Sequence, residues 1–337
     1  MHQPQTPPLS RRRFICHGMG AWAAAQLPSL HARDANLTPV EATRHALGAR
    51  VRIQVLAPDT ELAHSAIGEA FAAIEAVEQR MSLYRPNSEI SRLNRHGKLR
   101  SPSASLRRVL QTATRLARRS EGAFDITIQP LWDLYHQAKQ SNTPPSRAER
   151  DEALDRVDWN TLRLEEEQVT LTRPGSAITL NGIAQGVAAD QAQAALRRSG
   201  IEHAIVDCGE LAPLGRKAEN HPWQVGIQHP RDPDAFAALI PMTDRCLATS
   251  GDYETRFSDD FTLHHILDPR TGQSPPQLAS VTVAAPTATL ADALSTTLLI
   301  LGIETGFELM AQFDNVDALA IMKNGERRQS PGFPSGG

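Results

Sequence analysis

Two oxygen-bearing side chains, Asp292 and Thr296, stand four residues apart in an otherwise apolar stretch of the 337-residue chain. Residues four apart lie on the same face of a helix, so the Thr296 hydroxyl would stand one turn beyond the Asp292 carboxylate. A carboxylate in apolar surroundings costs free energy unless it is paired or bound to a cation. Such oxygens suit Mg²⁺, which takes few protein ligands and completes its shell with phosphate and water. Taken alone, a helix cap or an ion pair with a distant arginine explains Asp292 more simply.

A short glycine-containing segment, residues 180–186, has the sequence LNGIAQG and joins a predicted strand to a predicted helix. Its two glycines let the backbone approach a ligand closely, and free N–H groups at a helix start attract anions. Tight packing of the strand on the helix explains the glycines about as well. The segment lacks the spacing of dinucleotide-binding loops and the Gly-Lys-Ser/Thr of P-loops, so by itself it is a weak signal.

The segment HHILDPRTG, residues 264–272, ends a predicted strand in a turn. Asp-Pro and Thr-Gly are ordinary turn residues, whereas a neutral histidine at a strand end can accept a proton. Because neighbouring strand residues point to opposite faces, we expect only one of His264 and His265 to face a site. A solvated histidine is the alternative, and an isolated pair would favour it.

Two loops carry an aromatic residue beside polar groups, an arrangement suited to holding a planar base. Tyr84 lies in the run MSLYRPNSEIS, and Phe124 precedes Asp125 in GAFD. Either aromatic residue could equally cover an edge of the core. The segment ATSGDY, residues 248–253, closes a strand with hydroxyl groups and either caps a helix or lines a phosphate pocket.

The elements that must position these residues follow from hydrophobic periodicity and turn signals. The pattern predicts an α+β fold with a mixed, largely antiparallel sheet and packed helices. It places one domain at residues 40–328, with an exposed loop at 137–150 and a disordered tail at 329–337. We predict helices at residues 59–81, 88–93, 103–119, 183–199 and 303–313, besides the apolar helix ending before Gly302. Predicted strands are 51–56, 162–164, 169–172, 177–180, 203–207, 223–228, 236–240, 246–249, 262–267, 280–285 and 318–322.

Composition limits the class of protein. The chain has 40% hydrophobic and 22% charged residues, as an ordinary globular protein does. A formal net charge of −3 without a basic stripe argues against nucleic acid as a partner. Of the three cysteines, Cys208 and Cys246 lie in strand-like apolar runs, where buried free cysteines are common. We expect neither to be catalytic, although they could pair in an oxidising compartment.

The N-terminus carries an export pattern. Ser10, three arginines and Phe14 match the twin-arginine signal and precede a mildly apolar stretch, with no acidic residue before Asp34. We therefore predict a signal peptide at residues 1–32 and a periplasmic protein, attached to the inner membrane if the signal stays uncleaved. A disordered basic tail fits the apolar stretch less well.

Taken in order, six runs resemble the FAD:protein FMN transferases, the ApbE family. The runs are MSLYRPNSEISRLN, GAFDITIQPLW, LNGIAQG, ATSGDY, HHILDPRTG and ADALSTTLLILG, and they extend from Met81 to Gly302. Each run is modest alone, but six in the family's order are highly specific. The resemblance implies an ApbE-like, T-fold-related architecture.

The resemblance also implies an activity. Family members bind FAD and Mg²⁺ and transfer the FMN moiety of FAD through a phosphodiester bond to a threonine or serine hydroxyl of an acceptor flavoprotein, releasing AMP. Mg²⁺ neutralises charge on the diphosphate, and the protein positions the reactants. The alternatives are a periplasmic FAD-binding protein that supplies flavin without transferring it, and a Mg²⁺-dependent FAD pyrophosphatase.

The resemblance implies roles for particular residues. Asp292, Thr296 and the backbone oxygen of Gly182 match metal ligands. His265 matches the histidine of the family's His-Ile…Asp-Pro motif and is our candidate general base, because an unperturbed histidine pKa near neutrality suits that task. The other matches are FAD-contacting positions: Leu47, Tyr84, Ala123, Phe124, Asp125, Gln185 and Ile266.

The chain departs from the family pattern at several positions. Many members have Lys or Glu at the position of Gln185, and Asp-Leu or Asp-Phe at that of Thr179-Leu180. Gly-Gly-Asp often stands where this chain has residues 208–210 (CGE), and some members have a third metal-side carboxylate at the position of Ser295. LNGIAQG together with CGE is similar to the subgroup linked to nitrous oxide reductase maturation. That likeness implies a membrane-anchored flavoprotein of nitrous oxide respiration as the acceptor.

Overall fold

The structure is a computed structural model that describes residues 37–141, 143–217 and 221–334. The predicted twin-arginine signal at residues 1–32 lies outside the described residues and stays a prediction. Within the described ranges, no helix has both the length and the apolar character needed to cross a membrane.

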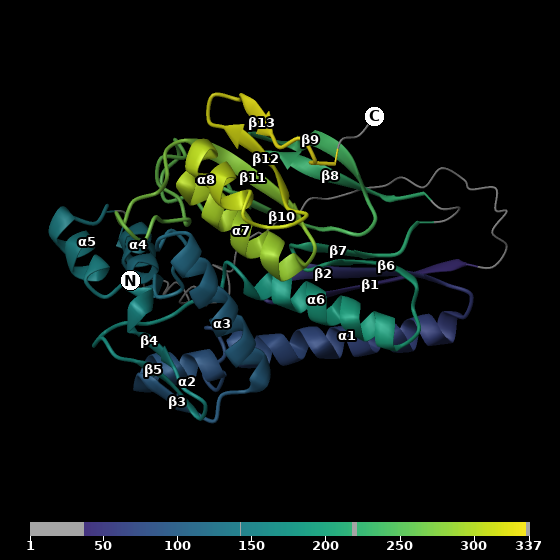
Figure 1. Ribbon diagram of the computed structural model, residues 1–337, viewed down its shortest axis with the longest axis horizontal. Coiled ribbons are helices and arrows are strands. Elements are labelled where there is room, and N and C mark those ends of the chain that lie inside the picture. The colour runs from purple at the N-terminus through teal and green to yellow at the C-terminus, as the bar shows by residue number, and fades with distance from the viewer. Residues whose placement is uncertain (1–36, 142, 218–220, 335–337) are drawn as a thin grey trace, which may run out of the picture.

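An eight-stranded sheet forms the centre of the fold (Figure 1). Each strand pairs antiparallel with its neighbours, which confirms the predicted α+β class with a largely antiparallel sheet. In spatial order the strands are β1 (Thr38–Ala46), β2 (Ala49–Ala57), β6 (His203–Asp207), β7 (Leu211–Leu214), β10 (Cys246–Gly251), β11 (Leu278–Ala285), β12 (Asp317–Met322) and β13 (Arg327–Gln329).

Three helices cover one face of this sheet: α1 (Thr60–Met81), α6 (Ala184–Arg198) and α7 (Ala288–Leu301). The α6 helix contacts both α1 and α7 (Figure 1). Alternate residues of β2, beginning at Val51, are fully buried against these helices, as the period of a strand requires. The predicted helix at 59–81 is confirmed as α1. Asp59 caps this helix, because its side chain accepts hydrogen bonds from the N–H groups of Glu61 and Leu62.

A hairpin covers the other face of the sheet. It consists of β8 (Trp223–His229) and β9 (Asp232–Met242), and Trp223 packs with the sheet's outer apolar residues. Because both of its faces are covered, β11 is buried along its whole length. The tail beyond the sheet also packs here: Phe333 is 4% exposed, and Ser330 hydrogen-bonds Ala318 in both directions. Predicted disorder is therefore wrong for residues 329–334.

The remaining elements form a subdomain at one end of the sheet (Figure 1). The predicted helices at 88–93 and 103–119 are confirmed as α2 and α3, which Ser88 and Ser103 cap, and the predicted strands 162–164 and 169–172 pair as a hairpin. These elements are α2 (Glu89–His96), β3 (Lys98–Arg100), α3 (Ala104–Arg119), α4 (Gln129–Ser141), α5 (Arg147–Leu154), the 3₁₀ helix Trp159–Thr161, β4 (Leu162–Leu164) and β5 (Gln168–Leu171); α8 (Ile303–Met310) follows α7.

Three sequence predictions of local structure are wrong. Residues 137–150 are largely helical rather than an exposed loop, since α4 buries Tyr135 and a capping box of Ser146 and Glu149 starts α5. Residues 177–180 form no strand, because the Ile178 N–H bonds the Asn94 side chain instead of a neighbouring strand. Residues 262–267 are a loop with one isolated bridge at His264.

Candidate active site

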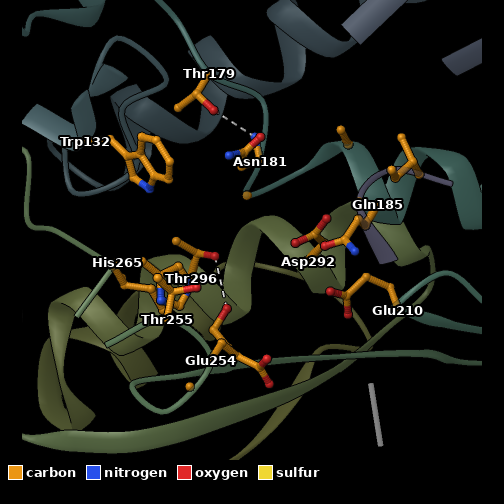
Figure 2. A pocket seen from close by; sticks show the side chains of 18 of the residues that line it. Trp132, Thr179, Asn181, Gln185, Glu210, Glu254, Thr255, His265, Asp292 and Thr296 are labelled. Carbon is orange, nitrogen blue, oxygen red and sulfur yellow. Dashed lines mark hydrogen bonds between the residues drawn. The ribbon is translucent and has the colours of Figure 1, made fainter. Parts of the chain in front are cut away.

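A cavity of about 300 Å³ lies where the starts of α6 and β7, the end of β10 and one face of α7 meet several loops (Figure 2). Its size is within the range of small-molecule sites. Segments far apart in the sequence therefore share one pocket. The structure brings to its lining all the residues that the sequence singled out, whose roles as ligands stay predictions: Leu47, Tyr84, Ala123, Phe124, Asp125, Gly182, Gln185, His265, Ile266, Asp292 and Thr296.

The start of α7 is fixed from two sides. The side chain of Thr287 caps its first turn, and the Asp190 carboxylate of α6 accepts bonds from the N–H groups of Ala288 (2.8 Å) and Thr289 (3.0 Å). The helix carries Asp292 one turn further on, with its side chain in the cavity.

Asp292 is 4% exposed, and its Oδ2 accepts a 2.9 Å hydrogen bond from the N–H of Gly186. The α6 helix has no side-chain cap of its own, so Asp292 caps the neighbouring helix rather than its own. The alternative that Asp292 caps its own helix is therefore wrong, because Thr287 caps α7. Burial raises the pKa of Asp292 to about 7, although the Gly186 bond lowers it.

The hydroxyl groups of Ser250 and Thr296 stand along the same wall, and the buried Ser295 hydroxyl adjoins them. The Ser250 Oγ lies 3.0 Å from the Thr296 Oγ1 and 2.7 Å from the Ser295 Oγ. The backbone of Gly182 approaches them closely, since a Cβ built there would lie only 3.4 Å from the Thr296 Oγ1. A carboxylate, hydroxyls and a backbone turn therefore line one wall of the cavity.

This donor set fits a divalent cation. Among the residues the structure describes, no three His, Cys, Asp or Glu side chains are grouped to hold a metal by themselves. A cation here would need hydroxyl, backbone and ligand oxygens, which is the coordination Mg²⁺ accepts. A cation beside Asp292 would also offset the desolvation that raises its pKa.

His265 lines the cavity on the side of Thr296 (Figure 2). Its backbone N–H bonds the Thr255 carbonyl at 2.9 Å. Its ring Nδ1 is buried without a hydrogen-bond partner. Burial lowers the pKa of His265 to about 4, so the expectation of an unperturbed pKa is wrong. The ring is still neutral at pH 7 and can accept a proton.

His264 turns away from the cavity. It is fully buried, its backbone exchanges hydrogen bonds with the Ser274 hydroxyl, and burial lowers its pKa to about 3. Only one histidine of the pair therefore faces the site, as expected, but because of loop geometry rather than strand alternation.

The loop that carries His265 is tied to the β8–β9 hairpin. Arg231 of the hairpin forms a bidentate pair with Asp252, which is fully buried, at 2.7 and 2.8 Å. The Arg231 guanidinium also lies 4.0 Å from the centre of the Phe261 ring, and Lys323 bonds the Phe261 carbonyl. These contacts hold a segment that has little regular structure of its own.

The open end of the cavity is aromatic. Tyr84, which is 59% exposed, and Trp132 of α4 both line the cavity, and Figure 2 shows the Trp132 side chain. The loop of Tyr84 is clamped to α1, because Arg85 bonds both oxygens of Glu75 at 2.8 Å and reaches Glu78 at 3.1 Å. The rim is thus suited to a flat ring system.

The Asp125 carboxylate holds its own segment in place through hydrogen bonds. One oxygen accepts from the N–H and hydroxyl of Thr127, both at 2.7 Å, and the other accepts from the N–H of Trp159 at 2.9 Å. With both oxygens engaged, Asp125 holds Ala123 and Phe124 at the cavity wall.

Leu47 and Gln185 reach the cavity through particular backbone geometry. Leu47 has φ +53° and, with Gly48 at +75°, forms the two-residue turn between β1 and β2. The Gln185 amide donates to the Cys208 carbonyl at 3.0 Å. The side chain that replaces a charged residue of the family pattern therefore holds the turn after β6.

Among the lining residues that were not predicted as site residues are Trp132, Glu210, Ser250 and Glu254. Burial raises the pKa of Glu254 to about 7. The runs QPLW, CGE and SGDY, which contain or adjoin them, carried the available signal. Their side-chain directions depend on loops that periodicity does not describe.

Fold and site together define an α+β protein whose cavity joins a buried carboxylate and hydroxyl wall to aromatic side chains. Residues 47–320 match the family model described as ApbE family. The chain belongs to the ApbE family.

Curated relatives carry the name FAD:protein FMN transferase. The chain is 34% identical over 271 residues to the protein of Haemophilus influenzae, a match that covers 76% of this chain and 78% of the relative. It is 31% identical over 309 residues to that of Treponema pallidum, covering 84% of each.

Solved structures agree with this assignment. The flavin transferase ApbE from Vibrio cholerae superposes with a TM-score of 0.75 at 27% identity, over 89% of this chain and 97% of that one. The ApbE protein from Thermotoga maritima gives 0.78 at 29% identity, over 88% and 98%.

Proposed function

We propose that this protein transfers the FMN moiety of FAD to a threonine or serine hydroxyl of an acceptor flavoprotein, through a phosphodiester bond, and releases AMP. The observation that carries the proposal is the cavity, which joins a carboxylate and hydroxyl wall, a neutral histidine and an aromatic rim. The names of the relatives support the same activity.

Magnesium is the proposed cofactor. Asp292 and Thr296 would hold it with side-chain oxygens and Gly182 with its backbone oxygen. Bound there, Mg²⁺ would neutralise charge on the FAD diphosphate.

His265 is the proposed general base. The acceptor hydroxyl oxygen forms a bond to the phosphorus on the FMN side, while the bond from that phosphorus to the bridging oxygen breaks. AMP leaves with the bridging oxygen, and the hydroxyl proton passes to the His265 Nε2. Its low pKa keeps the ring neutral at neutral pH, and the tautomer with its proton on Nδ1 would leave Nε2 free to accept this proton.

The rim would bind the ring systems of FAD. Tyr84 would meet the adenine side, and Leu47, residues 123–125 and Ile266 would contact the flavin nucleotide. The clamped loop of Tyr84 keeps its ring oriented before the ligand arrives, which lowers the cost of binding.

We further propose that the protein works in the periplasm after twin-arginine export, with a membrane-anchored flavoprotein of nitrous oxide respiration as acceptor. The N-terminal pattern and the LNGIAQG and CGE runs support this. Replacing Arg11 and Arg12 by lysine should keep the protein in the cytoplasmic fraction. Periplasmic recovery of that variant would contradict the twin-arginine route.

Release of AMP tests the activity against its alternatives. The purified protein is incubated with FAD and Mg²⁺, with and without a candidate acceptor domain, and AMP is quantified. A transferase releases AMP only when the acceptor is present. AMP and FMN released without acceptor would instead indicate a pyrophosphatase, and tight FAD binding without AMP would indicate a flavin-supplying protein.

A further inference from the structure

Glu210 is a buried carboxylate that the proposed reaction does not yet use. It is 6% exposed and lines the cavity, and its Oε2 is buried without a hydrogen-bond partner. In Figure 2 it lies with Asp292 and Gln185 at one end of the cavity. An unpaired polar atom in such a place costs free energy unless something binds it.

A hydrogen-bonded turn at residues 207–210 holds Glu210 at this end of the cavity. The Gly209 N–H donates to Asp207 at 3.0 Å, and the Cys208 N–H donates to the Glu210 carbonyl at 3.0 Å. Gly209 has φ +94°, and a Cβ on it would lie 2.7 Å from the Gln185 amide nitrogen. Only glycine therefore lets Gln185 reach the Cys208 carbonyl and close the turn.

The contrast with other buried carboxylates indicates a ligand. Asp125 and Asp252, which are buried, and Asp190, which is half-buried, each use both oxygens to accept hydrogen bonds from the protein. Both oxygens of each carboxylate therefore have hydrogen-bond partners, and these carboxylates serve to hold the fold. Glu210 differs because one of its oxygens is buried and left over.

Two buried carboxylates at one end of a cavity repel each other. Glu210 is 6% exposed and Asp292 is 4% exposed, so each carboxylate has lost most of its hydration. No cationic side chain lines the cavity between them among the described residues. A bound cation would relieve both the desolvation and the repulsion.

We propose that Glu210 is a second carboxylate for the divalent cation of Asp292, bound to it directly or through a water, and that Gln185 holds the turn presenting it. The inference rests on the cation site in the proposed function. It gives Gln185 a positioning role in place of the charged cofactor contact.

Binding of Mn²⁺ alone tests this without FAD or turnover. Free Mn²⁺ is measured by electron paramagnetic resonance during titration of the metal-free protein. We expect Glu210→Gln to weaken Mn²⁺ affinity at least about 10-fold, in line with losses at supporting residues of metal sites. Gln185→Leu should weaken it several-fold, because Glu210 remains but its turn is released. Glu308→Gln, an exposed charge loss on α8, is the control and should change nothing.

Thermal unfolding separates binding from folding. Glu210→Gln should unfold at the same or a higher temperature than the wild type without metal, since a buried unpaired carboxylate has been removed. It should also lose most of the rise in Tm that Mn²⁺ gives the wild type. Unchanged Mn²⁺ affinity in a folded Glu210→Gln protein would overturn the inference.

The Asp292→Asn variant separates a failure of the proposed role of Glu210 from a failure of the proposed cation site. If it abolishes Mn²⁺ binding and Glu210→Gln does not weaken it, only the role of Glu210 fails. If neither variant affects binding, the proposed cation site itself fails.

Discussion

Two kinds of carboxylate can be distinguished among those at buried or half-buried positions. Asp125, Asp190 and Asp252 are paired on both oxygens and hold loops and helix ends in place. Asp292 and Glu210 face the cavity with raised pKa values and incomplete pairing. Such incomplete pairing is expected at a functional site rather than in a structural core.

His265 should stay neutral across the range in which most histidines titrate. Burial lowers its pKa from 6.5 to about 4, so ¹⁵N NMR of the ring should show no protonation between pH 8 and pH 5.5. A His265→Gln variant identifies the signal. A titration midpoint near pH 6.5 would contradict the buried geometry.

The same shift carries a stability consequence. Between pH 6.5 and about pH 4 the unfolded chain binds a proton at His265 and the folded protein does not. The contribution of His265 to the free energy of unfolding is therefore complete above pH 6.5 and is lost as the pH falls through that window.

At the scale of elements, the contact of α6 with α7 sets the cavity. A Cβ on Gly186 would lie 2.3 Å from the Ala288 carbonyl oxygen and 2.8 Å from the Cβ of Asp292. The two helices therefore approach to a distance that only glycine permits. Of the two explanations for the glycines in LNGIAQG, packing accounts for Gly186, whereas Gly182 lines the cavity.

Gly186→Ala should force these helices apart. We expect a loss of about 1–3 kcal/mol in the free energy of unfolding, as overpacked cores show, together with weaker Mn²⁺ binding because Asp292 moves. Gly68→Ala in α1 is the matched control, since nothing lies within 4 Å of its new Cβ. That control should stabilise by about 0.5–1 kcal/mol. Equal effects in urea denaturation would contradict the packing argument.

The tie between the β8–β9 hairpin and the loop that carries His265 gives a second prediction at this scale. Arg231→Met leaves Asp252 buried with only Lys323, at 3.7 Å, as a cationic partner. We expect a loss of roughly 2–4 kcal/mol in stability and a lower kcat, because the loop positions His265.

Arg147→Met is the control for that variant. Arg147 pairs with Asp151 on the surface, where both side chains are mostly exposed, so its removal should be nearly neutral. Comparable destabilisation of the two variants in chemical denaturation would show that the hairpin tie has no special role.

At the scale of the molecule, long amphipathic helices and their caps were predictable. The caps at Asp59, Ser88 and Ser103 lie where side-chain acceptors precede apolar periodicity. The strand β1 was missed because most of its side chains are exposed, which leaves little alternation to detect. Likewise β13 is exposed throughout and only three residues long.

The site was predictable as a set of segments but not as geometry. Motif order indicated which residues would meet, and all of them line the cavity. Glu210 and Trp132 were missed because their directions depend on tertiary contacts, such as the bond from Gln185 to the Cys208 carbonyl. The lowered pKa of His265 follows from burial, which local sequence does not encode.

The intact mass of an acceptor flavoprotein domain, measured after incubation with this protein, FAD and Mg²⁺, tests the central claim most directly. The account predicts that the acceptor gains the mass of one FMN, less water, at a single threonine or serine. An acceptor of unchanged mass, recovered beside FAD that is bound or hydrolysed, would contradict it.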